Sequence, residues 1–268
     1  GCQGMFDGLD GKAQAPIPKQ LVSRMKSMGM TPASPIRVRL FQVDNALEVW
    51  KRRNTGRYAL LESFEICKWS GKLGPKFKEG DRQAPEGFYH VNRHLMNPKS
   101  DYHLAFNIGY PNAFDRAHGR TGSHLMVHGA CSSAGCYSMT DERVEEIYAL
   151  AREAFNGGQK AFQIQAYPFR MTAENMVKHR NSEHFEFWNM LKRGYDHFEL
   201  TKVPPKVDVC EKRYEFNTVS SQRYPSSGTC PAREMPQTLA FAYVDKQNTF
   251  NRKFERLMAR TDGRQPIE

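Results

Sequence analysis

Two histidines and two cysteines lie within one short stretch of this sequence, residues 124–139 (HLMVHGACSSAGCYSM), which joins an apolar segment to a predicted helix. The four side chains are His124, His128, Cys131 and Cys136. A thiol beside an imidazole is the pair that performs nucleophilic acyl transfer in cysteine enzymes. The same residue types can also bind zinc or form a disulfide. The remaining sequence has to distinguish these uses.

Cys136 and His128 fit the nucleophile and its base. A free thiol is only a few per cent thiolate at neutral pH, so an imidazole that accepts the thiol proton raises its reactivity. Gly135 allows a tight turn that would aim backbone amides at a developing oxyanion. Thr140 is a good helix N-cap. We therefore expect Cys136 just before a helix N-terminus, where the dipole favours the thiolate.

Two alternatives remain open for the same stretch. His124, His128, Cys131 and Cys136 could bind zinc, although their spacing lacks the paired form of usual structural sites. Cys131 and Cys136 could form a local disulfide, which would block the nucleophile. Cys131 could also be an unbridged neighbour. Elsewhere, Cys67 is most simply a small buried residue.

Short strands dominate the first half of the chain and must position this stretch. Alternating apolar residues and turn signals predict strands within 36–41, 46–50, 58–69, 84–91 and 102–108. A short helix is expected within 17–30. The apolar residues of 140–155 recur at helical spacing, and Asn156-Gly157-Gly158 ends that helix. The stretch with the cysteines therefore follows the last predicted strand of this half.

Composition narrows the function classes. The chain has 268 residues, ordinary apolar content and a formal charge of +10 that is not gathered into one block. The sequence contains no run of about 18 apolar residues, so it predicts no membrane-spanning helix. The charge suits an anionic polymer. We find no nucleic-acid-binding motif, and a carboxylate-rich cell-wall polymer satisfies the charge equally well.

At these residues the sequence resembles the L,D-transpeptidases, the family with a YkuD-type catalytic domain. His128-Gly129 followed by 133–136 (SAGC) is similar to the signature of the branch related to YafK. Supporting similarity extends over roughly residues 33–215, including 80–89, 109–122, 167–172 and 187–192. One departure is Ala134, since many members carry histidine or arginine directly before the glycine.

The resemblance implies a mainly β fold with flanking helices (α+β), a small sandwich or barrel-like sheet with the nucleophile at a helix N-terminus. It implies that Cys136 attacks the carbonyl at the L-centre of diaminopimelate in peptidoglycan stem peptides. His128 would act as base and then acid, and backbone amides near Gly135 and Tyr137 would stabilise the oxyanion. A thioester would pass to an amine. No metal and no organic cofactor is expected.

Substrate contacts are expected from Tyr110, Asp115, Gly129 and Ser133. Transfer to water would make the protein an amidase that releases peptidoglycan-linked protein or peptide. A non-enzymatic peptidoglycan-binding module is a further alternative. Acceptors could include an outer-membrane protein or lipoprotein, and no nucleic acid is expected as a partner. The resemblance implies a periplasmic location, with Cys2 as a candidate lipid anchor.

The predicted domain organisation has three parts. Residues 1–32 form a leader and short helix, 33–215 the catalytic domain and 216–268 a C-terminal extension. Cys210 and Cys230 flank a turn-rich segment and could close a disulfide loop. Near the C-terminus, an apolar helix face and a basic one suit either an anionic surface or docking on the domain. The apolar residues are Phe250, Phe254, Leu257 and Met258, and the basic residues are Arg252, Lys253, Arg256 and Arg260.

Overall fold

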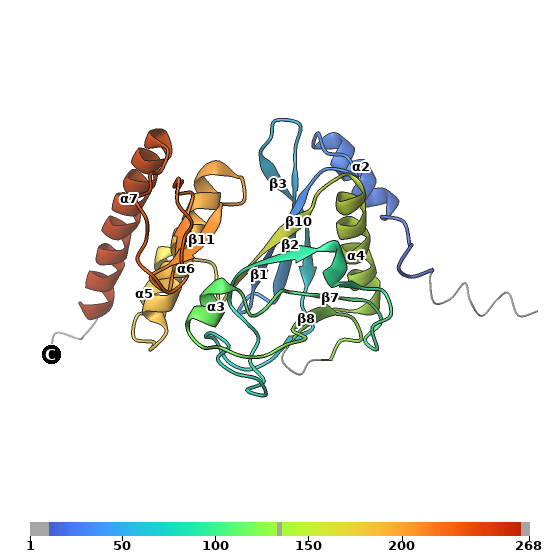
Figure 1. Cartoon of the computed structure of the whole chain (residues 1–268), viewed down its shortest axis with the longest axis horizontal. Coiled ribbons are helices and arrows are strands. Elements are labelled where there is room, and N and C mark those ends of the chain that lie inside the picture. Colours follow the sequence, from blue (N-terminus) through green and yellow to red (C-terminus); the bar gives the residue numbers. More distant parts are fainter. Residues whose placement is uncertain (1–10, 133–135, 264–268) are drawn as a thin grey trace, which may run out of the picture. The chain divides into compact units, whose positions relative to one another are not determined.

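The computed structural model of the chain describes residues 11–132 and 136–263. The chain forms two compact units, Gly1–Pro168 and Phe169–Glu268. The predicted catalytic segment 33–215 therefore covers most of the first unit and part of the second. The first unit contains two mixed five-stranded sheets and helices, so it is an α+β fold (Figure 1).

The first sheet of unit 1 has the strand order β3-β2-β1-β10-β5. Neighbouring strands pair antiparallel except β1 and β10, which run parallel. Val38, Leu40, Val49 and Ile164 of this sheet belong to the buried hydrophobic core. The strands are β1 (Ile36–Phe41), β2 (Ala46–Arg52), β3 (Tyr58–Glu65), β5 (Gly87–Asn92) and β10 (Ala161–Tyr167).

The second sheet has the order β4-β9-β8-β7-β6 and is built from very short strands. Its central pair, β8 and β9, runs parallel, and the other pairs are antiparallel. Phe106, Val127 and Tyr137 extend the same hydrophobic core as the first sheet. The strands are β4 (Lys68–Trp69), β6 (Met96–Asn97), β7 (Ala105–Asn107), β8 (Met126–His128) and β9 (Tyr137–Ser138).

Helix α4 (Asp141–Asn156) is the main helix of unit 1. The Thr140 side chain accepts a hydrogen bond from the Arg143 amide, and acidic residues occupy the first turn, so the predicted helix start is confirmed. Val144, Ile147 and Leu150 are buried in the core. The shorter helices are α2 (Lys19–Ser27), η1 (Arg93–Leu95) and α3 (Ala113–Ala117).

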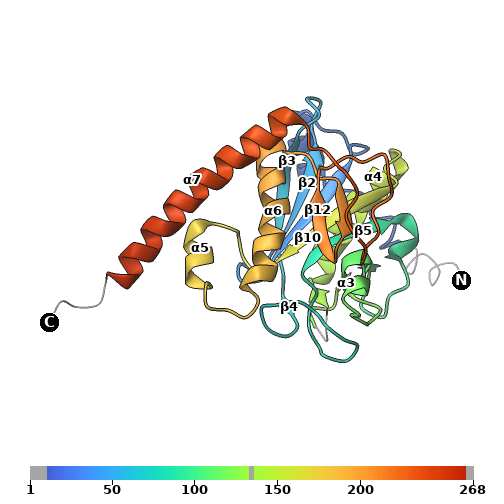
Figure 2. The same ribbon diagram turned by 60° about the vertical axis from the view of Figure 1, so that its left-hand side comes forward.

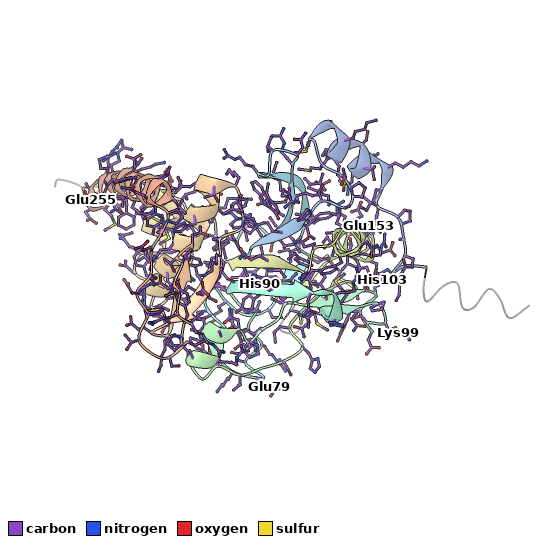
Figure 3. The ribbon with its side chains drawn as sticks, turned by 45° about the horizontal axis from the view of Figure 1, so that its top comes forward. Glu79, His90, Lys99, His103, Glu153 and Glu255 are labelled. Carbon is purple, nitrogen blue, oxygen red and sulfur yellow. A yellow bond between two sulfur atoms is a disulfide. The ribbon has the colours of Figure 1, made fainter. Side chains whose placement is uncertain are left out.

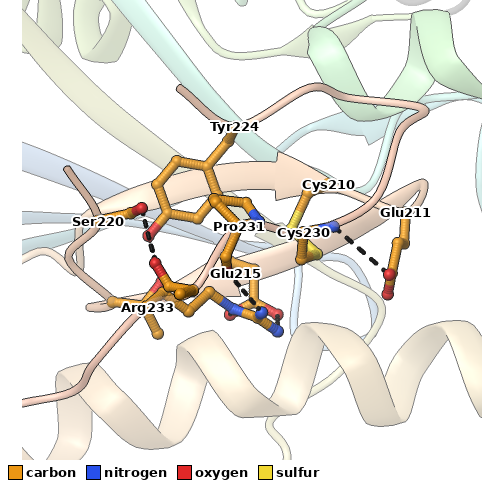
Figure 4. Close-up of a disulfide and its surroundings, with 10 residues drawn as sticks. Cys210, Glu211, Glu215, Ser220, Tyr224, Cys230, Pro231 and Arg233 are labelled. Atoms are coloured by element: carbon orange, nitrogen blue, oxygen red, sulfur yellow. Dashed lines mark hydrogen bonds and ion pairs between the residues drawn. A yellow bond between two sulfur atoms is a disulfide. The ribbon is translucent and has the colours of Figure 1, made fainter. Parts of the chain in front are cut away.

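Unit 2 contains the helices α5 (Ala173–Lys178), α6 (Phe185–Thr201) and α7 (Gln237–Asp262), with the hairpin of β11 (Val207–Cys210) and β12 (Arg213–Phe216). The Cys210–Cys230 disulfide is present, and Arg233 pairs with Glu215 nearby (Figure 4). Helix α7 packs on α5 and α6 (Figure 2). Phe254 contacts the rings of Phe185 and Phe250, so this helix is docked within its unit. No helix within residues 11–132 and 136–263 is long and apolar enough to cross a membrane.

Candidate active site

The parallel pairing of β8 and β9 brings the two predicted site residues together. Val127 lies opposite Tyr137 and His128 opposite Ser138. Because side chains alternate along a strand, His128 and Cys136 project from one face, whereas Val127 and Tyr137 project from the other. The side chains of Val127 and Tyr137 are fully buried in the core. His128 and Cys136 therefore both face the opposite side, where a pocket opens.

The pocket has a volume of about 560 Å³ and is lined by polar side chains and one methionine. Of the two histidines and two cysteines in the sequence stretch, His124, His128 and Cys136 line the pocket, and Cys131 does not. Its size is in the range of small-molecule sites. The lining residues are Asn97, Ser100, Asp101, Tyr102, His124, Met126, His128, Ser132 and Cys136.

Cys136 is partly buried and is not disulfide-bonded within the described residues. Its sulfur accepts a hydrogen bond from the Met126 amide at 3.3 Å and lies 3.7 Å from the His124 carbonyl oxygen, to which the thiol donates. Burial raises the pKa of Cys136, and the Met126 hydrogen bond and the positive charge of Lys76 offset this only in part. The thiol, rather than the thiolate, is therefore the resting form at neutral pH.

The expected position of Cys136 at a helix N-terminus is wrong. Strand β9 follows Cys136 directly, and α4 begins only at Asp141, after Thr140. The helix dipole acts within about one turn of the terminus, so it does not lower the pKa of this thiol. If Cys136 is to act as a nucleophile, a neighbouring base has to accept its proton.

His128 is buried and held in one tautomer. Its Nδ1 lies 2.6 Å from the Gly129 carbonyl oxygen, which can only accept, so Nδ1 carries the proton. Nε2 is then the unprotonated nitrogen. Burial lowers the pKa of His128, and the Gly129 carbonyl offsets this in part. The imidazole is therefore neutral at pH 7 and able to accept a proton at Nε2.

Tyr102 is a pocket residue that the sequence analysis did not single out. Its ring lies over the His128 imidazole, with centroids 4.6 Å apart and planes tilted by 37°. The next residue is His103, which is labelled in Figure 3. Its Nε2 lies 2.7 Å from Glu145 Oε1 of α4. Tyr102 thus covers one face of His128 while its neighbour anchors the segment on α4. Its place at the start of the predicted strand 102–108 carried no signal for this role.

Gly129 lies where three segments meet. A Cβ atom at this position would lie 2.8 Å from Asp141 Oδ1, 2.8 Å from the Tyr102 carbonyl oxygen and 3.0 Å from His103 Cβ. The Gly129 amide donates to the Tyr102 carbonyl at 2.9 Å. Only glycine fits at this position beside His128, because the neighbouring atoms leave no room for a side chain. This position supplies its carbonyl, not a side chain, to the site.

Tyr137 presents only its backbone to the site. Its side chain projects into the core, where the hydroxyl donates to the Pro85 carbonyl at 2.8 Å and accepts from Gln42 at 3.0 Å. Burial raises the pKa of Tyr137 strongly. Gly135 and Ser133, the other two residues expected beside Cys136, lie outside the described residues.

Tyr110 and Asp115 do not line the pocket and instead join structural contacts. The Tyr110 hydroxyl is within hydrogen-bond distance of the carbonyls of Lys76 and Thr121 (3.2 and 3.1 Å). Asp115 caps α3 together with Asn112 and pairs with Arg120 at 3.2 Å. Burial raises the pKa of both residues. Nothing in these contacts places either side chain against a substrate in the pocket.

Cys131 forms a disulfide with Cys67, with Cα atoms 5.4 Å apart. This corrects the expectation that Cys67 is an unbridged buried residue, and it excludes the Cys131–Cys136 disulfide. A bridged Cys131 is also unable to serve as a thiolate ligand, so the four-residue zinc site is wrong. A second grouping of metal-ligand types, Cys210, Glu215 and Cys230, contains the other disulfide and lacks free thiolates for the same reason.

The chain is similar to proteins of one family. Residues 38–160 match the YkuD model, described as an L,D-transpeptidase catalytic domain. YafK of Escherichia coli K12, whose name describes it as a candidate L,D-transpeptidase, is 44% identical over 209 residues, covering 78% of this chain and 83% of YafK. The corresponding protein of Escherichia coli O157:H7 matches to the same extent.

Two solved structures are more distant. The helical cell shape determining protein Pgp2 of Campylobacter jejuni has a TM-score of 0.40 and 20% identity, covering 70% of this chain and 80% of that chain. Bd1075 of Bdellovibrio bacteriovorus has a TM-score of 0.37 and 16% identity, covering 65% and 76%. The extent and identity of the YafK match decide the assignment: the chain belongs to the L,D-transpeptidase family with a YkuD-type catalytic domain.

Proposed function

We propose that this protein is a cysteine-dependent acyl transferase that acts on peptidoglycan stem peptides, with Cys136 as nucleophile and His128 as general base. The observation that carries the proposal is the shared face of β8 and β9. There, a thiol outside any disulfide and an imidazole with an unprotonated Nε2 line the same pocket. Family membership supports peptidoglycan as the substrate.

The reaction starts from a neutral pair. The pKa of Cys136 is raised and that of His128 is lowered, so a resting thiolate–imidazolium pair is disfavoured. His128 Nε2 therefore removes the Sγ proton as the sulfur attacks the carbonyl at the L-centre of diaminopimelate. The Gly129 carbonyl accepts the Nδ1 hydrogen bond and stabilises the imidazolium that forms. Backbone amides at Cys136 and Tyr137, with Gly135, are the proposed oxyanion donors.

Collapse of the tetrahedral intermediate releases the terminal D-residue. The imidazolium returns its proton to the leaving amine, and a thioester remains on Cys136. An amine acceptor then attacks the thioester and gives a new amide bond, which is transpeptidation. If water attacks instead, the outcome is hydrolysis, and the protein acts as an amidase. We favour transfer to an amine, and an outer-membrane protein or lipoprotein is a candidate acceptor.

Two disulfides within the described residues support an extracytoplasmic location, because disulfides persist in oxidising compartments. We place the protein in the periplasm. Cys2, the candidate lipid anchor, lies outside the described residues. The formal charge of +10 is compatible with an anionic wall polymer, and no nucleic-acid partner is proposed.

The test is incubation with diaminopimelate-containing muropeptides followed by intact-protein mass spectrometry. The wild-type chain should gain the mass of the acyl donor without its terminal D-residue, as a hydroxylamine-sensitive thioester on Cys136. Cys136→Ala should give no adduct and no product. His128→Gln should reduce acylation by about 100-fold or more. An added amine then distinguishes the transpeptidation product from the hydrolysed one.

Two results would refute the proposal. Product formation by Cys136→Ala would place the chemistry elsewhere. Muropeptide binding by a folded wild-type chain without any adduct or turnover would instead indicate a non-enzymatic binding module. Wild-type and variant chains with matching circular dichroism spectra are the required control for both results.

A further inference from the structure

We propose that the Cys67–Cys131 disulfide is a positioning element of the active site, so that transfer by Cys136 depends on whether this bridge is oxidised. The inference deepens the proposed function and rests on it. The bridge joins residues 64 positions apart. Its two ends lie on the segments that adjoin β9 and β8, the strands that carry the site.

The Cys67 end is fixed to β9. The Cys67 amide donates to the Ser138 carbonyl at 2.8 Å. Beyond it, Lys68 pairs with Ser138 and Trp69 with Tyr137, so β4 runs along the outer side of β9. The Ser138 hydroxyl adds a hydrogen bond to the Lys68 carbonyl at 3.1 Å. Cys67 is therefore held beside the strand that begins directly after Cys136.

The Cys131 end is fixed to the residue that holds His128. Only Gly129 and Ala130 separate His128 from Cys131, and the Gly129 carbonyl accepts the His128 Nδ1 hydrogen bond. Ala130 and Cys131 both adopt left-handed backbone conformations, with φ of 62° and 45°. Side chains other than glycine disfavour this region, so surrounding contacts must maintain it.

The described contacts that maintain this turn are few. The Ala130 amide donates to Asp141 at 2.7 Å, and the Cys131 amide donates to the Met139 carbonyl at 3.0 Å. Ala130, Cys131 and Ser132 are exposed, so little packing restrains them. The disulfide is the covalent restraint on this turn. The Gly129 amide remains bonded to the Tyr102 and Leu104 carbonyls, but without the bridge we expect residues 130–132 to sample other conformations and the Gly129 carbonyl to turn away from His128 Nδ1.

The bridge is accessible to a reductant in solution. Cys131 is exposed and Cys67 is half-buried. A thiolate of dithiothreitol can attack the Cys131 sulfur and release the Cys67 thiol. The second thiol of the reductant then displaces Cys131, which leaves two protein thiols and one oxidised dithiothreitol. The oxidation state of the bridge can thus be set by experiment without replacing a residue.

The experiment compares the Cys67→Ser/Cys131→Ser chain with Cys210→Ser/Cys230→Ser, which removes the bridge of unit 2. The first variant should acylate Cys136 about 10–100-fold more slowly in single turnover, because small displacements of catalytic groups have effects of this size. Muropeptide affinity should change less than about threefold, as expected when orientation rather than binding is lost. The control variant should acylate at the wild-type rate.

A second readout does not depend on activity. The Nδ1 proton of His128, hydrogen-bonded to Gly129 in the oxidised chain, should be visible by NMR and should be lost without the Cys67–Cys131 bridge. It should persist in the Cys210→Ser/Cys230→Ser chain. If no chain forms a thioester, the proposed function fails, and this resonance still decides whether the bridge positions His128.

Reduction provides the complementary test. The Cys210→Ser/Cys230→Ser chain is reduced with dithiothreitol, and the reductant is removed before substrate is added because its thiols would cleave a thioester. Reduction should slow acylation to the level of the Cys67→Ser/Cys131→Ser variant, and reoxidation should restore it. An unchanged acylation rate and an unchanged His128 resonance after loss of the bridge would overturn the proposal. So would global unfolding at 25 °C on both reduction and substitution, since the bridge would then be a general brace of unit 1.

Discussion

Gly129→Ala should destabilise the protein through steric overlap at the point where His128, Tyr102 and α4 meet. The φ angle of Gly129 is outside the left-handed region, so alanine costs nothing in backbone conformation. Its Cβ would instead lie 2.8 Å from both Asp141 Oδ1 and the Tyr102 carbonyl oxygen. Neither can move freely, because Asp141 accepts from Ala130 and the Tyr102 carbonyl accepts from Gly129.

Three contributions determine the expected loss in the free energy of unfolding. Overpacking costs about 1–3 kcal/mol, and one weakened hydrogen bond adds about 1 kcal/mol. Alanine also lowers the conformational entropy of the unfolded chain, which offsets about 0.4–1 kcal/mol of this destabilisation. The net loss is about 2 kcal/mol, which corresponds to a fall of roughly 4–8 °C in the melting temperature of a domain of this size.

Calorimetry measures the melting temperature, and iodoacetamide alkylation measures the reactivity of Cys136. Gly56→Ala is the matched control, since Gly56 has φ of 86° and open space around its Cβ position. That change should cost about 1 kcal/mol through backbone conformation alone and leave Cys136 alkylation unchanged. A Gly129→Ala chain that melts within about 1 °C of wild type would refute the close approach described for Gly129.

Three further outcomes are expected. Burial raises the pKa of Cys136, so its alkylation rate should have a pH midpoint above the ordinary thiol value of about 8.5. A midpoint near pH 5 would instead indicate a thiolate–imidazolium pair. Burial lowers the pKa of Lys51 to about 7 in the folded protein. Between this pH and about 10.4, the ordinary pKa of lysine, the unfolded state therefore binds more protons than the folded state. The free energy of unfolding should rise with pH in this range, by up to about 1.4 kcal/mol per pH unit. Urea unfolding of Lys51→Met should lack this increment between pH 7.5 and 9.5, and an identical slope in both chains would contradict the assignment. Asp115→Asn should cost about 3 kcal/mol in urea unfolding, because Arg120 keeps its buried charge without a carboxylate, while Cys136 alkylation stays at the wild-type rate.

The strands and helices that flank the site could be predicted from local sequence. Alternation predicted β1 and β2, and the Thr140 cap with its acidic first turn predicted α4. These features depend on residues close in the chain, where periodicity and capping act. The motif also singled out His128 and Cys136 as candidate site residues, and both line the same pocket.

Features that depend on distant contacts were less accessible. The sequence shows that Thr140 starts a helix but not that residues 137–138 pair with β8 first, so the expected dipole effect on Cys136 was wrong. Cys67 and Cys131 are paired only because β4 lies beside β9. Tyr102 reaches His128 through a segment anchored by His103 on α4. Each of these results from tertiary packing that no local pattern encodes.

The parallel register of β8 and β9 also bears on how this site can diverge during evolution. Strand pairing, not the length of residues 129–136, determines that His128 and Cys136 share a face. An insertion in that connection would leave the pairing of Val127 with Tyr137 intact and add residues only at the pocket rim, where Ser132 lies. A one-residue slip within either strand would turn one of the two side chains into the core. For the proposed transferase, acceptor choice could therefore change by loop variation, while the geometry of the proposed pair His128 and Cys136 is inherited with the sheet.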